Sequence, residues 1–160
     1  MLAPLLEGRD TGLLSEAGVP AVADPGALLV REAHARGIHV VPLVGPSSVV
    51  LALMASGLEG QRFRFVGYLP ADSAARRTAI GELERISARD RETQVFIETP
   101  YRNEALFAAL LDTCREKTRL CVAADLTLAT ESISTKNIAE WRRAKAAVGK
   151  RPAVFLLLAD

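Results

Sequence analysis

Residues 12–26, GLLSEAGVPAVADPG, constrain the fold of this chain more than any other stretch. Residues 12–15 end an apolar run, and a helix pattern begins directly after the stretch, at Ala27. Gly18 can adopt a positive φ and lets another group approach the backbone closely, while Pro20 and Pro25 fix φ and remove two donors. The pattern indicates a buried strand that ends in a ligand-binding loop, because ligands of open α/β sheets lie beyond the carboxyl ends of strands. An ordinary strand-to-helix connection, stiffened by proline and glycine, explains it equally well.

A second loop of the same kind follows the predicted strand 38–43. Residues 44–48, VGPSS, lead into an apolar helix predicted over 49–55, with Ser47 as its N-cap and Gly57 as its stop. Free backbone N–H groups and two hydroxyls at this helix N-terminus suit a polar ligand group. Capping alone would explain one serine. We expect loops 15–26 and 44–48 to lie side by side at one sheet edge.

The polar residues 59–62 mark a predicted domain boundary, which gives domains 1–58 and 59–160. In the second domain strand and helix patterns alternate, which predicts an α/β fold. Residues 1–6 read as a helix end, although parallel α/β sheets begin with a strand, so we expect the first domain to be incomplete. The predicted strands of the second domain are 63–69, 93–97, 120–124 and 153–158. The predicted helices are 73–88, 104–114 and 136–147. Asn103 is the expected cap of the second of these helices, and residues 129–132 are expected to form a polar turn.

Composition narrows the function classes. With 160 residues, of which 49% are hydrophobic, the chain can bury a core, and its net charge of +1 is no global nucleic-acid signature. Two cysteines make neither a disulfide framework nor a metal site, and His34 and His39 lack partners at metal spacing. We therefore expect no metal site. We also expect a cytoplasmic protein, because no secretion signal or membrane span is evident.

Arginines surround the predicted helix 73–88, which has an apolar face that includes Ile80 and Leu83. The surrounding arginines can form a solvated face, which is the more ordinary interpretation, or a patch that faces phosphate groups. They are Arg76, Arg77, Arg85, Arg89 and Arg91.

Several of these stretches together resemble the tetrapyrrole (corrin/porphyrin) methylase superfamily, and most closely its branch of 16S ribosomal RNA 2′-O-ribose methyltransferases. The resemblance is collinear over almost the whole chain, but the family's first strand and its Gly/Pro-rich loop have no counterpart here. The matching stretches are LLSEAGVPAVADPG at 13–26, VPLVGPSSV at 41–49, FVGYLP at 65–70, SAARR at 73–77, IETPYR at 97–102 and AADLTLATES at 123–132.

The resemblance implies two α/β domains, the first one incomplete, and S-adenosyl-L-methionine bound across the cleft between them. It also implies a homodimer that methylates ribosomal RNA or a small molecule. Asp24 would order the first loop. The residues that the resemblance assigns to the cofactor are Ala17, Gly18, Val19, Asp24, Ser47, Ser48, Glu98 and Leu126.

The implied reaction is an in-line displacement at a sulfonium-bound methyl group, which depends mainly on positioning and on a desolvated site. A ribose hydroxyl would also have to lose its proton. Glu98 and Glu131 are the catalytic candidates, together with Asp125 as a further carboxylate at a strand end. Glu98 could equally cap the following helix. A different class of function stays open, namely a non-catalytic α/β module that has lost cofactor binding.

Overall fold

The computed structural model describes residues 3–16 and 18–160 of the chain. They form two compact units, Met1–Ser47 and Ser48–Asp160. The boundary expected from the sequence, after residue 58, would place the helix at 48–56 in the first domain. In the structure this helix packs on the sheet of the second unit.

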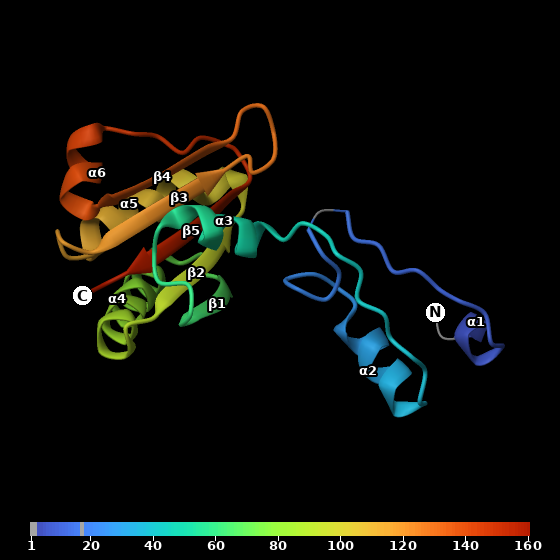
Figure 1. Ribbon diagram of the computed structural model, residues 1–160. Coiled ribbons are helices and arrows are strands. Elements are labelled where there is room, and N and C mark those ends of the chain that lie inside the picture. Colours follow the sequence, from blue (N-terminus) through green and yellow to red (C-terminus); the bar gives the residue numbers. More distant parts are fainter. Residues whose placement is uncertain (1–2, 17) are drawn as a thin grey trace. The chain divides into compact units, whose positions relative to one another are not determined.

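The second unit is a five-stranded mixed sheet with helices on both faces (Figure 1). Strand order is β1-β2-β5-β3-β4, in which β1 and β2 run parallel and β5 runs antiparallel to both of its neighbours. The strands are β1 (Phe63–Tyr68), β2 (Thr93–Glu98), β3 (Arg119–Ala124), β4 (Ser132–Asn137) and β5 (Ala153–Leu158). The helices are α3 (Ser48–Ser56), α4 (Ser73–Asp90), the 3-10 turn η1 (Pro100–Arg102), α5 (Asn103–Thr113) and α6 (Ile138–Ala144).

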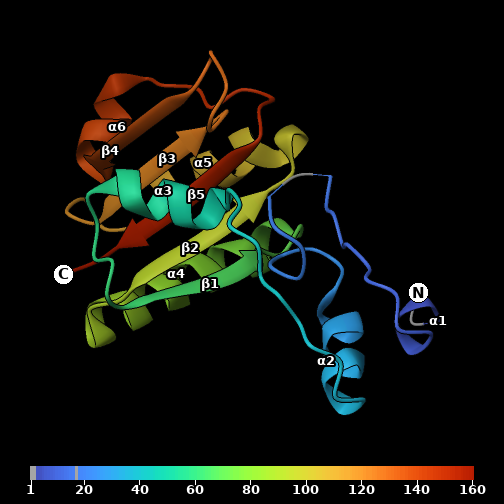
Figure 2. The same cartoon turned by 45° about the vertical axis from the view of Figure 1, so that its right-hand side comes forward.

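Side chains of the central strand β5 fill cores on both faces of the sheet. Phe155 points to the side of α4 and α5 and stacks on Phe96 with ring centroids 5.9 Å apart. Leu156 points to the opposite side, beneath α3. Figure 2 shows α3 on one face of the sheet and α4 and α5 on the other. The continuous apolar run at 153–158 is therefore what a strand buried on both faces requires.

Strand β4 differs from the sequence-based expectation of a turn at 129–132 and a helix from residue 136. Its six residues pair with the whole of β3, and they are half-buried or exposed because β4 lies at the sheet edge. The following helix begins only at Ile138, where Asn137 and Glu140 form a reciprocal capping box. The polar composition of this edge strand hid it, whereas the Asn-x-x-Glu spacing could have located the helix start.

Asn103 does not cap α5 as predicted, because η1 precedes the helix and Arg102 occupies the cap position. The Asn103 side chain is instead fully buried and donates hydrogen bonds to the carbonyls of Gly149, at 3.0 Å, and Arg151, at 2.7 Å. These bonds fix the segment that enters β5.

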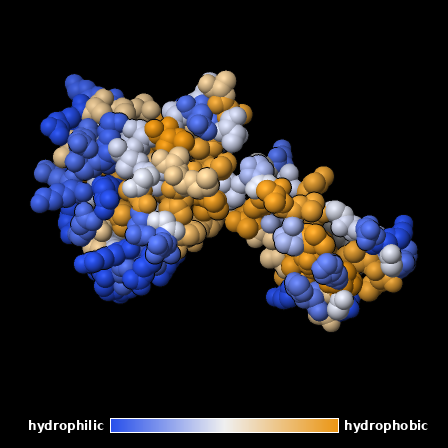
Figure 3. Space-filling model, in the orientation of Figure 1, coloured by the Kyte–Doolittle hydropathy of each residue, from blue (hydrophilic) through white to orange (hydrophobic). Residues whose placement is uncertain are grey.

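The first unit contains the helices α1 (Ala3–Leu6) and α2 (Ala27–Ala35), and its described residues form no strand. The strands predicted at 12–15 and 38–43 are therefore absent, since an extended segment becomes a strand only when a neighbour completes its hydrogen-bond ladder. Leu14 and Leu43 are 91% and 85% exposed, and Figure 3 shows hydrophobic residues at the surface of this unit. None of the helices in the described residues has the length and hydropathy needed to cross a bilayer.

Candidate functional site

Glu98 ends β2 and holds the turn that follows it. Its side chain is fully buried, and Oε1 accepts hydrogen bonds from the Thr99 amide at 2.6 Å and from Arg102 Nε at 2.9 Å. Oε2 is buried and has no hydrogen-bond partner among the described residues. Glu98 therefore fixes this turn without capping the following helix, since neither η1 nor α5 has a side-chain cap hydrogen bond, and one of its carboxylate oxygens is free to accept a donor.

Asp125 follows β3 in a similar position, with a left-handed backbone at φ 53°. Its Oδ2 accepts a hydrogen bond from Thr130 Oγ1 at 2.9 Å and lies 3.5 Å from Arg151 Nη1. The backbone N–H of Asp125 donates to the Pro152 carbonyl at 3.0 Å. The carboxylate is therefore ion-paired and fixes the loop that begins at residue 125.

Leu126 and Glu131 belong to this same loop. The Leu126 side chain packs against the core beneath α3, so the group that Leu126 can offer to a ligand is its backbone. Glu131 is exposed, and its Oε2 accepts a hydrogen bond at 2.7 Å from the amide of Thr127, a residue with φ 70°. Left-handed non-glycine residues such as Asp125 and Thr127 are strained, and such strain clusters at ligand sites. Glu131 therefore stabilises a strained loop around Leu126.

The strand register brings the carboxyl ends of β2 and β3, which carry Glu98 and Asp125, to the same end of the sheet. Glu98 and Ala124 both pair with Ala153, the first residue of β5, from opposite sides. Because neighbouring strands lie about 4.8 Å apart, the backbones of the two strand ends are separated by about 10 Å. This end of the sheet therefore holds two carboxylates, each with its own arginine partner.

In the first unit the two predicted loops approach each other at Val19 and Gly45. A Cβ built on Gly45 would lie 3.4 Å from Val19 Cγ1. Gly18 has φ +73°, and a Cβ placed there would meet no heavy atom within 4 Å. Ser15 Oγ donates to the Gly18 carbonyl at 3.3 Å. The Gly18 backbone is therefore exposed to solvent, in a left-handed conformation that favours glycine.

The remaining predicted cofactor residues are distributed between the two units. Asp24 is half-buried in the first loop, Ser47 is half-buried, and Ser48 is exposed as the first residue of α3. In both ribbon views the N-terminal end of α3 lies on the side of the sheet where β2 and β3 end (Figure 2). Ala17 lies outside the described residues.

Three residues of the site were not found from the sequence. Arg102 and Arg151 neutralise Glu98 and Asp125, and Thr130 donates to Asp125. The spacing of four residues between Glu98 and Arg102 is a local signal that could have been read. Arg151 carries no such signal, because only the pairing of β3 with β5 brings it to Asp125.

The thiols and potential metal ligands give no further chemistry to this site. Burial raises the pKa of the Cys114 thiol to about 12, and burial also raises the pKa of Cys121. Neither thiol is a nucleophile at neutral pH, since the thiolate is the reactive form. Within residues 3–16 and 18–160, no three His, Cys, Asp or Glu side chains converge in a way that could hold a metal ion.

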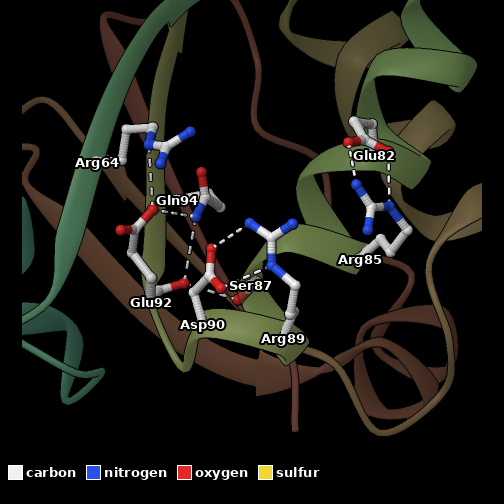
Figure 4. A network of polar contacts seen from close by, with 8 residues as sticks. All are labelled: Arg64, Glu82, Arg85, Ser87, Arg89, Asp90, Glu92 and Gln94. Atoms are coloured by element: carbon white, nitrogen blue, oxygen red, sulfur yellow. Dashed lines mark hydrogen bonds and ion pairs between the residues drawn. The ribbon is translucent and has the colours of Figure 1, made fainter.

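Most arginines around α4 are paired with carboxylates and form a solvated face (Figure 4). Arg85 Nε donates to Glu82 at 2.8 Å, and Arg89 Nε donates to Asp90 at 2.7 Å. The Arg85 hydrogen bond lowers the pKa of Glu82, and the Arg89 hydrogen bond lowers the pKa of Asp90. Arg77 lies 3.9 Å from Asp112 of α5. The ordinary interpretation of the arginine pattern therefore applies to these three residues.

The mixed sheet with helices on both faces and polar strand ends defines an α/β protein with a candidate ligand site at one sheet edge. The family model for Tetrapyrrole (Corrin/Porphyrin) Methylases matches residues 1–141. The chain belongs to the tetrapyrrole methylase family.

Curated relatives carry a common name, ribosomal RNA small subunit methyltransferase I. The relative from Vibrio cholerae is 38% identical over 136 residues, which cover 85% of this chain and 46% of the relative. The relative from Xylella fastidiosa is 45% identical over 98 residues, which cover 61% of this chain and 34% of the relative. The chain thus spans about half the length, or less, of the curated relatives that it matches.

Solved structures show the same fold at low sequence identity. The methyltransferase CobJ superposes with a TM-score of 0.62 at 20% identity, covering 99% of this chain and 68% of that one. A uroporphyrin-III C-methyl transferase from Thermus thermophilus, complexed with S-adenyl homocysteine, gives a TM-score of 0.52 at 19% identity, covering 88% of this chain and 62% of that one.

Proposed function

We propose that this chain acts as an S-adenosylmethionine-dependent methyltransferase on ribosomal RNA, with the ribose 2′-oxygen as the methyl acceptor. The observation that carries the proposal is the family match over residues 1–141. The name shared by the curated relatives supports the RNA substrate. The 2′-oxygen rests on the motif resemblance described above.

Each unit, taken by itself, has residues that suit a part of the proposed cofactor. The open space beside Gly18 would let the cofactor approach the backbone, and the Val19–Gly45 contact holds the two loops of the first unit together. In the second unit the strained Asp125–Thr127 segment offers the backbone of Leu126, and the free oxygen of Glu98 can accept a hydrogen bond. When bound, the cofactor supplies a methyl group on a positively charged sulfur.

The chain's own task in this reaction is to orient the acceptor and to take its proton. As the ribose oxygen forms its bond to the methyl carbon, the carbon–sulfur bond breaks and its electron pair stays on sulfur. The hydroxyl proton passes to a carboxylate. Glu131 is exposed and so is accessible to a hydroxyl, whereas the side chain of Glu98 is fully buried and ion-paired. We therefore assign the proton to Glu131 and a positioning role to Glu98.

We also propose that the protein forms a homodimer in the cytoplasm. The exposed apolar side chains of the first unit, among them Leu14, Leu43 and Val44, support self-association, because monomeric proteins rarely expose contiguous apolar surface. Sedimentation at tens of micromolar should show a dimer, and a monomer throughout that range would contradict this part of the proposal.

The second candidate is a non-catalytic α/β module that keeps the fold without binding the cofactor. It is favoured by the absence of any strand among the described residues of the first unit. This candidate predicts a folded protein with no affinity for S-adenosylmethionine.

Methyl transfer to small-subunit ribosomal RNA, measured with a labelled methyl donor, tests the proposed function. We expect the label to survive alkaline hydrolysis in a dinucleotide, because a methylated 2′-oxygen cannot attack the neighbouring phosphate. Glu131→Gln should lower the rate about 10²–10⁴-fold, as loss of a general base does. The control Glu82→Gln changes an exposed carboxylate on α4 and should transfer methyl groups at the original rate. A folded, cofactor-bound chain that labels no RNA would contradict the proposal.

A further inference from the structure

Arg76 is the exception among the arginines of α4. The residue is only 7% exposed, and no carboxylate of the described residues lies within ion-pair distance of its guanidinium. Its Nε is buried without a hydrogen-bond partner. Its Nη1 makes one long hydrogen bond, of 3.4 Å, to the carbonyl of Ala71. Arg76 is therefore a buried cation whose charge the described residues leave uncompensated.

Such a cation is costly unless an anion accompanies it. A guanidinium keeps its proton in proteins, so the buried side chain of Arg76 remains a cation. Buried charges are normally paired or hydrogen-bonded, because removing a charge from water is unfavourable. The missing partner of Arg76 is thus expected to be an anion from outside the described residues.

The guanidinium is directed at the start of α4. Helical side chains lean toward the helix N-terminus, and the Ala71 carbonyl precedes the N-cap residue, Asp72. The amides of Ser73 and Ala74 in this first turn have no hydrogen-bond partner in the part of the chain that the structure describes, whereas Asp72 Oδ1 accepts from Ala75 N–H at 2.8 Å. Two free amides and a buried guanidinium therefore converge at one helix end, with the exposed carboxylate of Asp72 beside them.

The start of α4 lies at the end of the sheet where β2 finishes with Glu98. Strand β1 ends at Tyr68, four residues before Asp72, and Tyr68 pairs in register with Ile97, the neighbour of Glu98. An anion at Arg76 would therefore lie at the same end of the sheet as the polar carboxyl ends of β2 and β3.

We propose that Arg76, with the amides of Ser73 and Ala74, binds a phosphate group of the RNA backbone. The choice of RNA rests on the proposed function, while the choice of phosphate rests on the site. Guanidinium donors and helix N-terminal amides both match phosphate oxygens, and one buried cation provides for a single contact. The site thus positions the RNA strand and carries no base recognition.

The first test measures the salt dependence of binding to a single-stranded RNA oligonucleotide, using the full chain. Each neutralised phosphate of a single strand contributes about −0.7 to the slope of log K against log salt. Arg76→Met should reduce the slope by about 0.7, and Arg76→Lys should keep it. The matched control Arg85→Met removes an exposed, ion-paired arginine of the same helix and should leave the slope unchanged. An unchanged slope in folded Arg76→Met would overturn the proposal.

The second test uses inorganic phosphate, which separates a free anion from an RNA strand. Phosphate should raise the melting temperature of the original chain and of Arg85→Met but not that of Arg76→Met. Without phosphate, Arg76→Met should melt at or above the temperature of the original chain, since it removes an uncompensated buried charge. A lower melting temperature with an unchanged RNA slope would make Arg76 a structural residue. Phosphate stabilisation without any effect on the RNA slope would also overturn the assignment to RNA.

Cofactor binding by the same variants separates this proposal from the proposed function. Arg76→Met should bind S-adenosylmethionine as the original chain does, because Arg76 is none of the residues assigned to the cofactor. A chain that binds no cofactor but shows the Arg76-dependent slope would refute the methyltransferase proposal and leave the phosphate site standing.

Discussion

The two units of this chain use a similar density of apolar residues with opposite results. In the second unit, strand β5 is buried along its whole length and feeds cores on both faces of the sheet. In the first unit, among its described residues, Ala33 is the one hydrophobic residue that is buried. Apolar sequence thus becomes a core only where the chain also supplies the neighbouring strands that satisfy the backbone.

The two units also differ in how firmly they hold the predicted site residues. The second unit holds its carboxylates by ion pairs and hydrogen bonds within its own sheet, as Glu98 and Asp125 show. The first unit contributes glycine-rich loops with few anchoring contacts, such as the one around Gly18. We expect substitutions in the two units to affect different measurements.

Separation of the two units should have the largest effect. A fragment of residues 48–160 is expected to fold alone and to melt cooperatively, because both core clusters consist of residues from this range. A fragment of residues 1–47 should show no cooperative transition in circular dichroism. Failure of 48–160 to fold in isolation would refute the contrast between the units.

A pair of truncations sharpens the same contrast. Phe155→Ala removes a fully buried ring that stacks on Phe96 and should lower the free energy of unfolding by about 3–5 kcal/mol. Leu43→Ala removes a side chain that is 85% exposed and should change it by less than about 0.5 kcal/mol. Denaturant unfolding of both variants measures the difference, and equal losses would mean that Leu43 is buried in solution.

Within the first unit, two glycines should differ in their tolerance of a side chain. A Cβ at Gly26 would lie 2.9 Å from Leu13 Cδ2 and 3.2 Å from Ala21 N, at a φ of +141° that L-residues rarely adopt. Gly26→Val should therefore cost about 1–3 kcal/mol from strain alone, and more from the clash. Gly18→Val meets open space and should cost only the left-handed strain of about 1–2 kcal/mol. Melting temperatures in the reverse order would contradict the described loop geometry.

The exposed ion pairs of α4 should have the smallest effect, visible as a pH dependence. The hydrogen bond from Arg85 lowers the pKa of Glu82 below its ordinary value. A lowered folded-state pKa contributes stability above the unfolded pKa, and this contribution is lost as the pH falls through the folded value. Glu82→Gln should therefore lower the melting temperature slightly at pH 7, and the difference from the original chain should vanish as the pH falls through the folded pKa of Glu82. A difference that persists in strong acid and is absent at pH 7 would refute this assignment.

The sequence predicts elements whose signals are local or strongly periodic. The apolar run 153–158 is strand β5, and Asp72, one of the two residues expected to cap the helix at 73–88, accepts from the Ala75 amide at 2.8 Å. Strand β4 was missed because an edge strand is half polar and follows no apolar pattern. Strands were predicted at 12–15 and 38–43 from apolar runs alone, which say nothing about the presence of a pairing partner.

The residues of the candidate site also differ in whether the sequence alone could predict them. Polar residues at strand ends marked Glu98 and Asp125 in the sequence, since the end of a buried strand is a local feature. Arg151 lies 26 residues beyond Asp125 and reaches it only through the antiparallel pairing of β3 with β5. The buried state of Arg76 was equally hidden, because the four arginines of α4 look alike in the sequence until their partners are known.

Calorimetric titration of the folded chain with S-adenosyl homocysteine tests the central claim most directly. We predict saturable binding by the original chain, and no binding by a Gly18→Val variant whose melting temperature shows that it stays folded. The side chain of valine would fill the open space at Gly18 that the proposed cofactor needs. A folded original chain that takes up no ligand, or a Gly18→Val variant that binds with full affinity, would contradict the account.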